Sequence, residues 1–162
     1  MAWSNSKIFS ACLTDALNKT RGINLGGDTI EAALFDNTVT PSQTVASAST
    51  AYGAGVWASG GVVDTGSSAP AGWPALGRPL GSLSSAFSSN VYTFTAANTA
   101  SANSVTTLTN AYGCLVYDHT TTSPAGTTDA GICFNYFGGA NSVTLGSFTI
   151  AWNASGIFTL TL

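Results

Sequence analysis

The sequence predicts a mainly β protein, a single antiparallel β-sandwich or jelly-roll-like domain with a short N-terminal helix. Short segments in which apolar and polar residues alternate recur along the chain, and turns rich in Gly, Pro, Ser and Thr separate them. Only one segment, close to the N-terminus, has apolar residues at helical spacing. The length of 162 residues suits one domain that buries a sizeable core.

The helix is expected near the start of the chain. Ser4, Asn5 or Ser6 can cap it, and apolar residues then recur at helical spacing. These apolar residues are Ile8, Phe9, Cys12, Leu13, Ala16 and Leu17. We therefore divide the domain into an N-terminal helix and arm, residues 1–25, and a β-sandwich, residues 26–162.

The sandwich is expected to begin with a strand over residues 29–35. A weakly patterned stretch, residues 44–50, can form a short helix, and the Gly60-Gly61 pair suits a turn or a bulge. Loops rich in turn-forming residues are expected over residues 66–78 and 120–128. Further short strands are expected over residues 80–83, 91–94, 105–108, 112–117 and 131–137.

The last twenty residues, Val143 to Leu162, have the clearest pattern in the chain. Two segments in which apolar residues alternate with polar or small ones flank the turn-forming run Asn153-Ala154-Ser155-Gly156, which predicts a β-hairpin with one apolar face. The residues of that face are expected to be core. They are Phe148, Ile150, Trp152, Phe158 and Leu160.

The chain carries few charges. Charged residues make up 7% of the sequence, against about 25% in an average globular protein. No lysine or arginine follows Arg78, and the net charge of -3 gives no basis for nucleic-acid binding. A neutral surface of Ser, Thr and Asn resists association poorly, so we expect a partner or further copies of the chain to cover much of it.

The sequence contains no targeting signal and no apolar run of the length that a membrane helix needs. We therefore expect no membrane partner and synthesis in a cytoplasm. Three cysteines, Cys12, Cys114 and Cys133, cannot all pair within one chain. In a reducing compartment each is expected to be a small buried apolar residue with a free thiol.

The sequence contains only weak candidates for catalytic or metal-binding groups. His119 follows Asp118 directly, and a solvated histidine at a strand end is the favoured interpretation. Asp28 with Glu31, or Asp36 with Asn37, could ligate calcium through oxygen atoms, but a turn or strand-edge role explains them better. We therefore predict no enzyme activity, no metal and no cofactor.

Aromatic residues in the expected loops offer one possible binding surface. Tyr52, Trp57 and Trp73 could form a surface patch on which a sugar stacks, because an aromatic face pairs with the apolar face of a sugar. For any one of them, a core or interface role is the better interpretation.

Seven short segments, in order along nearly the whole chain, form a recognisable set. They are Asp28-Thr29-Ile30-Glu31-Ala32-Ala33-Leu34-Phe35, Thr40-Pro41, Gly72-Trp73-Pro74-Ala75-Leu76-Gly77, Val91-Tyr92-Thr93-Phe94, Leu115-Val116-Tyr117-Asp118, Phe148-Thr149-Ile150-Ala151-Trp152 and Gly156-Ile157-Phe158-Thr159-Leu160. This set resembles the corresponding segments of a family of small structural proteins of tailed bacteriophages. In that family two glycines usually stand where this chain has Leu76-Gly77.

The resemblance implies a non-enzymatic virion component, often a minor capsid or decoration protein, with no catalytic residues to transfer. We expect the chain to be made in a bacterial host, to bind the major capsid protein on the capsid exterior and to stabilise the shell. A homotrimer suits the symmetry axes of such shells. The charged N-terminal quarter is then expected to dock, through Lys7, Lys19 and Arg21. The alternative is a tail or fibre component, which could bind a host glycan.

Overall fold

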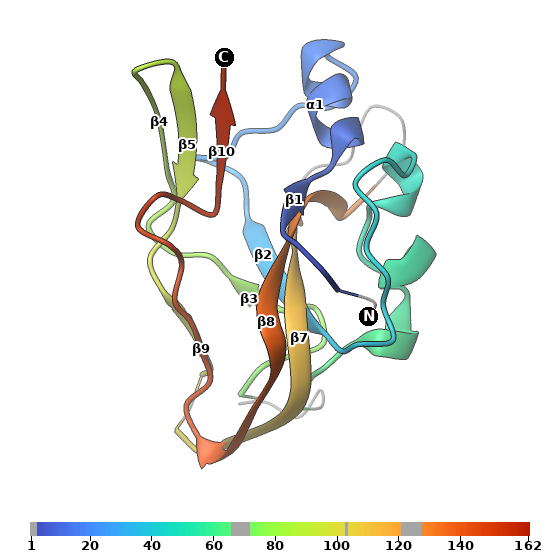
Figure 1. Cartoon of the computed structure of the whole chain (residues 1–162), viewed down its shortest axis with the longest axis vertical. Helices are drawn as coiled ribbons and strands as arrows, with labels where there is room; N and C mark the ends of the chain where they lie inside the picture. Colours follow the sequence, from blue (N-terminus) through green and yellow to red (C-terminus); the bar gives the residue numbers. More distant parts are fainter. Residues whose placement is uncertain (1–2, 66–71, 103, 121–127) are drawn as a thin grey trace.

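The computed structural model describes residues 3–65, 72–102, 104–120 and 128–162. Within these ranges the protein is mainly β, with antiparallel sheets and one short α-helix, which confirms the predicted fold class. Parts of the loops expected over residues 66–78 and 120–128 lie outside the described residues. Figure 1 shows the arrangement, a β-sandwich-like domain in which strands β4, β5 and β10 of a smaller sheet lie to the left of the large sheet's strands β7 and β8.

The large sheet has five strands in the order β1-β8-β7-β2-β3, and every neighbouring pair is antiparallel. Its long element is the pair β7 and β8, whose register shifts at several bulges. The bounds are β1 Lys7–Ile8, β2 Ile30–Phe35, β3 Arg78–Pro79, β7 Thr106–Asp118 and β8 Ala130–Gly146.

The second layer contains a three-stranded sheet in the order β10-β5-β4 and the two-stranded pair β6-β9. Ser89 and Asn90 join β4 to β5 with positive φ angles of 50° and 63°, as a tight hairpin turn requires. The bounds are β4 Ser84–Ser88, β5 Val91–Thr95, β6 Thr99–Ala100, β9 Thr149–Ile150 and β10 Phe158–Thr161.

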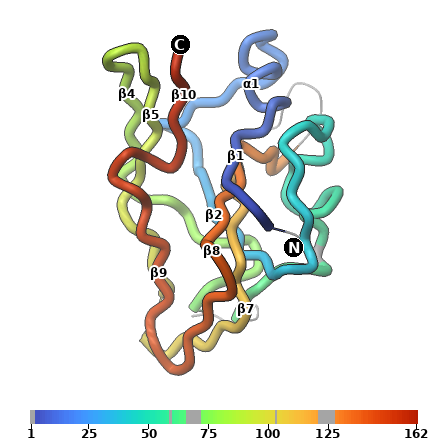
Figure 2. The backbone as a smooth tube through the Cα atoms, in the orientation of Figure 1, coloured from blue at the N-terminus to red at the C-terminus, as the bar shows by residue number. Residues whose placement is uncertain are grey.

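The remaining described elements are helical and lie on the other side of the large sheet or at its upper end (Figure 2). Helix α1 spans Ser10–Leu17, and three 3₁₀ helices span Ser47–Ser49, Gly55–Trp57 and Ser59–Gly61. The segment predicted as an N-terminal helix and arm, residues 1–25, contributes β1 to the edge of the large sheet. Its Trp3 side chain is buried, with 1% of its surface exposed.

Both faces of the large sheet are covered at its centre. Residues directly opposite one another on antiparallel strands share a face, so Ala33, Leu115 and Phe134 lie on one side of the sheet. Leu34 and Cys114 lie on the other side. Because both faces of the sheet are covered, strand β2 is apolar on both sides, and all of its residues except Glu31 are buried.

The first face is sealed by an aromatic cluster around Trp57. The Trp57 ring lies 5.1 Å from that of Phe35 and 5.9 Å from that of Trp3, in edge-to-face contact. It also lies 6.0 Å from the ring of Phe9 and 6.1 Å from that of Phe134. Aromatic pairs favour offset or T-shaped packing, and these rings together form the core on this face of the sheet.

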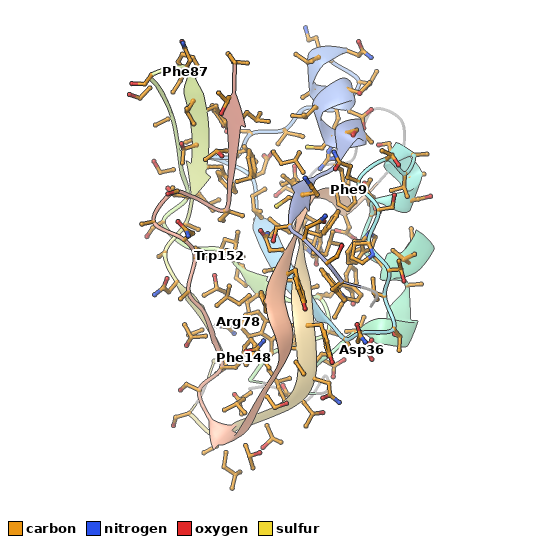
Figure 3. The ribbon with its side chains drawn as sticks, viewed as in Figure 1. Phe9, Asp36, Arg78, Phe87, Phe148 and Trp152 are labelled. Atoms are coloured by element: carbon orange, nitrogen blue, oxygen red, sulfur yellow. The ribbon has the colours of Figure 1, made fainter. Side chains whose placement is uncertain are left out.

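The second face packs against the smaller sheets. Phe148 and Ile150 are buried there, as predicted, and the Phe148 ring is 5.5 Å from that of Trp73. Trp152 is half-buried and its indole N–H donates to Thr99 Oγ1 at 3.0 Å. Figure 3 shows Phe148 and Trp152 on the side of the large sheet opposite Phe9.

The predicted C-terminal hairpin is wrong, although its turn and its strands exist. Asn153 O accepts from Gly156 N–H at 2.8 Å, and Gly156 has a φ of 109°, so the chain does turn there. The two arms do not pair with each other. Strand β9 pairs with β6, and strand β10 pairs with β5. The turn is therefore a corner between two sheets.

Other boundaries also differ from the sequence expectation. The strand expected over residues 80–83 does not form, and strands β3 and β4 lie on either side of those residues. The helix begins at Ser10 rather than near Ser6, because Lys7 and Ile8 pair with β8 and Gln43 O accepts the Ser10 N–H. The two strands expected over residues 105–117 are one strand, β7. Strand β8 continues past Gly138 and Gly139, which serve as bulge residues with φ of 84° and 156°.

Candidate docking groove

An apolar groove lies between helix α1 and the edge strand β10. Its main cavity has a volume of about 450 Å³ and adjoins a second of about 390 Å³. Ile8, Leu13, Phe158 and Leu160 line both cavities, so these side chains form the shared wall. The other apolar lining residues of the main cavity are Cys12, Ala16, Ile23, Leu25, Tyr92 and Ile132.

The local sequence explains why the groove is open. Strand β1 is only two residues long, and the chain turns into α1 directly afterwards. Helix α1 buries Cys12, while Leu13 and Ala16 line the cavity. Across the groove, β10 is hydrogen-bonded to β5 alone among the described strands. Leu160, which was expected in the core, is therefore a half-buried wall residue, and so is Phe158.

The groove opens at the end of the molecule where other large apolar side chains are exposed. Leu17 at the end of α1 is 87% exposed, and Leu162 beyond β10 is 86% exposed. Phe87, near the β4–β5 turn, is 58% exposed. Figure 1 shows that these three elements end at the same side of the molecule, and Figure 3 shows Phe87 there. Clustered exposed apolar residues mark interaction surfaces more often than single ones do.

The predicted docking residues differ in exposure: Lys7 and Lys19 are exposed, and Arg21 is buried. Lys7 and Lys19 are exposed, and Lys7 lines the second cavity, so their docking role stays a prediction. The prediction that Arg21 takes part in docking is wrong, because its side chain is buried, at 2% exposure. Its guanidinium donates to Ala130 O at 2.5 Å and to Gly131 O at 3.2 Å. Arg21 thus ties the loop after α1 to the start of β8.

The possible surface aromatic patch does not form, and the core role preferred for its single residues is confirmed for Trp57 and Trp73. Trp57 is 1% exposed and Trp73 is 0% exposed, because they pack into opposite faces of the core. Tyr52 is half-buried and stacks on Tyr117 with ring centroids 5.3 Å apart. The three side chains therefore cannot form one sugar-stacking platform, and the glycan-binding alternative loses the residues that suggested it.

His119 lies at the exposed end of β7, as expected, and the structure adds an ion pair. Its Nδ1 lies 2.6 Å from Asp129 Oδ1, which joins the end of β7 to the residue before β8. The hydrogen bond that His119 donates to the Asp129 carboxylate raises the pKa of His119, while partial burial opposes the rise. The pair is placed to close a loop between two paired strands, which is a structural role.

The acidic residues that could have bound calcium have turn and strand roles. Asp36 Oδ1 accepts from Thr38 N–H at 2.8 Å and from its hydroxyl at 2.6 Å. Asp28 Oδ2 accepts from Asn24 N–H at 2.6 Å, and the Tyr117 hydroxyl lies 2.8 Å from Glu31 Oε2. Among the described residues no group of three or more His, Cys, Asp or Glu is arranged to hold a metal ion.

The cysteines are free and buried, as expected. Burial raises the pKa of the Cys12 thiol to about 11 and that of Cys114 to about 12. Burial also raises the pKa of Cys133 well above its ordinary value. None of these thiols is activated for nucleophilic chemistry, which needs a lowered pKa.

No family model matches the sequence, and comparisons with curated proteins and with solved structures find no significant match. In the part of the chain that the structure describes, no helix has the length and apolar character needed to cross a membrane.

The groove was missed at the sequence level because its walls come from distant segments. The alternation through Leu160 is equally compatible with one face of a hairpin, so it does not indicate a groove wall. Leu17 carries no such signal in the sequence either, because its helical spacing groups it with core residues, although it is 87% exposed in the structure.

Proposed function

We propose that this protein is a non-enzymatic structural component of a bacteriophage particle, a decoration or minor capsid protein that binds the major capsid protein. It is made in the bacterial cytoplasm, binds the exterior of the shell and stabilises it. The observation that carries the proposal is the apolar end of the molecule, where the α1–β10 groove opens beside Leu17, Phe87 and Leu162.

An apolar surface of this kind suits assembly on a large protein lattice. Burying exposed leucine and phenylalanine side chains contributes roughly 1.5–3 kcal/mol for each one that is fully covered. The groove itself is hollowed, so a protruding segment of a partner can enter it. Lys7, at the groove, and Lys19, beyond α1, can fix the register of a docked partner, as charges at an interface rim do.

The chain's surface also favours self-association, and we propose a homotrimer on the particle. Strand β4 is fully exposed and hydrogen-bonded to β5 alone among the described strands. It contains Ser, Ala and Phe and no charged residue, so the usual protection of a sheet edge by lysine or proline is missing. Light scattering at high concentration tests this, and monomers both in solution and on the particle would contradict it.

Copy counting by mass spectrometry of purified virions tests the location. Hundreds of copies per particle are expected for a capsid protein. A handful of copies would place the protein in the tail and contradict the decoration role.

A matched pair of surface variants tests the docking end. Leu17→Asp adds a charge at the groove end, whereas Leu145→Asp adds the same charge where β8 ends, at the opposite end of the molecule (Figure 1). Both positions are more than 70% exposed, at 87% and 73%, so neither change should unfold the protein. Leu17→Asp is expected to abolish binding to shells that lack the protein, and Leu145→Asp to preserve it. The reverse result would refute the assignment.

A further inference from the structure

We propose that the partner docks by β-strand addition: an extended, apolar segment with an acidic residue at its end pairs with the free edge of β10 and fills the α1–β10 groove. This proposal adds a binding mode to the proposed function. It rests on the proposed function only in assigning the segment to the major capsid protein. Added strands gain affinity from main-chain hydrogen bonds and specificity from pockets for alternate side chains.

The backbone of β10 has an edge that is ready to pair. Leu162 N–H donates to Asn90 O at 2.9 Å, and Phe158 and Leu160 lie opposite Phe94 and Tyr92. In an antiparallel ladder the backbone groups of alternate residues point to opposite sides. The N–H and C=O groups of Thr159 and Thr161 therefore point away from β5. Thr159 lines the second cavity, so this edge faces the groove.

The groove matches the side chains of an extended strand. Its two cavities lie along β10 and share Phe158 and Leu160 as a wall. On an added strand, side chains two residues apart point to the same face, so successive apolar residues would enter the two cavities. A helix would not satisfy the backbone groups of Thr159 and Thr161, and this favours a strand as the occupant.

The charge of the groove sets the chemistry of the segment's end. Lys7 is the one charged side chain among the described residues that line the two cavities. The ion pair between His119 and Asp129 does not involve residues of this site. A carboxylate at the end of the docked segment would complement the Lys7 ammonium, and a lysine there would be repelled.

Three capped peptides test the proposal without any phage particle. The first alternates valine and threonine and has a glutamate at each end, the second has lysine ends, and the third has proline at the central valine. We expect the glutamate peptide to bind the full-length protein about two- to fivefold more tightly than the lysine peptide, the range of a surface ion pair. The proline peptide should bind at least roughly tenfold more weakly, because it lacks a donor and its ring is fixed in φ.

Two readouts locate the binding. Amide hydrogen exchange should slow at Thr159 and Thr161 when the glutamate peptide is added. Leu162, whose N–H already donates to Asn90 O, is the internal control. In Lys7→Glu the preference between glutamate and lysine ends should invert. This substitution is at an exposed position and should leave the fold intact.

Three results would overturn strand addition: no binding of the glutamate peptide at millimolar concentration, equal binding of all three peptides, or protection outside β10. Protection that rises with protein concentration alone would show that a second copy occupies the edge, and this also overturns the proposal. If virion copy counting succeeds while the peptides fail, the decoration role stands and strand addition does not.

Discussion

Truncating Trp57 to alanine tests whether the aromatic face of the large sheet is the main source of stability. Trp57 is 1% exposed and contacts four aromatic rings. A buried tryptophan removes about 200 Å² from water, which is worth roughly 5 kcal/mol at 25 cal/mol per Å². Measured truncations of this kind cost about 3–5 kcal/mol. We therefore expect Trp57→Ala to lower the free energy of unfolding by about 4 kcal/mol.

Trp152→Ala is the matched comparison, because sequence alternation predicted that Trp152 is core and the structure shows it half-buried. It should lose about 1–2 kcal/mol, including the hydrogen bond to Thr99. Urea unfolding followed by far-UV circular dichroism measures both, since fluorescence would change with each removed indole. Trp57→Phe, expected to cost less, serves if Trp57→Ala does not fold. A loss below about 1 kcal/mol for Trp57→Ala, or a larger loss for Trp152→Ala, would refute the reasoning.

Three further predictions concern packing, pH and thiols. Gly113→Ala should lower the free energy of unfolding in urea by about 1–3 kcal/mol, because an added Cβ would lie 2.5 Å from Asn135 O and from the Trp3 ring. Gly81→Ala should be nearly neutral, because nothing lies within 4 Å of a Cβ added there. The pKa of His119 is raised in the folded state, so the His119–Asp129 pair stabilises the fold below about pH 6.5, and this contribution is lost as pH rises through the folded pKa. Thermal melts should show a small drop in melting temperature over that pH range, and His119→Asn should remove the drop. At pH 8 an aromatic disulfide reagent should leave the thiols unmodified in the native protein and titrate three in urea; rapid native modification would contradict their burial.

The fold class could be predicted because it depends on local patterns. Alternating segments with Gly, Pro, Ser and Thr between them define strands and turns wherever they pair. Ile30–Phe35 and Val91–Thr95 were found within one or two residues for this reason. The turn at Gly156 was also found, since its composition reports a local conformation.

Strand partners could not be predicted in the same way. The segments on either side of the Asn153–Gly156 turn have compatible alternation, so a hairpin satisfies the local pattern. In the structure, β9 and β10 pair with β6 and β5, which lie more than 45 residues earlier in the chain. Only packing against the large sheet decides between these arrangements, and no single segment carries that information.

The predicted sites show the same division between local and distant information. Trp57 and Trp73 stand in loop-like sequence, which allows a surface patch, but their size favours the core or interface role preferred for each of them, and both are buried. Arg21 looked like a free cation, and its role depends on two carbonyls about 110 residues away, at Ala130 and Gly131. The groove depends on segments from both ends of the chain.

The open edge of β10 and the sealed aromatic face follow from the same arrangement of strands. Strands β2 and β7 lie inside the large sheet and are covered on both sides, so the core does not need the space between β1 and β10 to be filled. A solvent-facing strand edge is normally protected by lysine, proline or a covering segment. The outward backbone groups of β10 belong to Thr159 and Thr161, which provide neither charge nor a blocked N–H. With 7% charged residues, the chain also has little net repulsion to keep other strands away. An edge of this kind is open to pairing with another strand, and this is why we propose a partner that covers it.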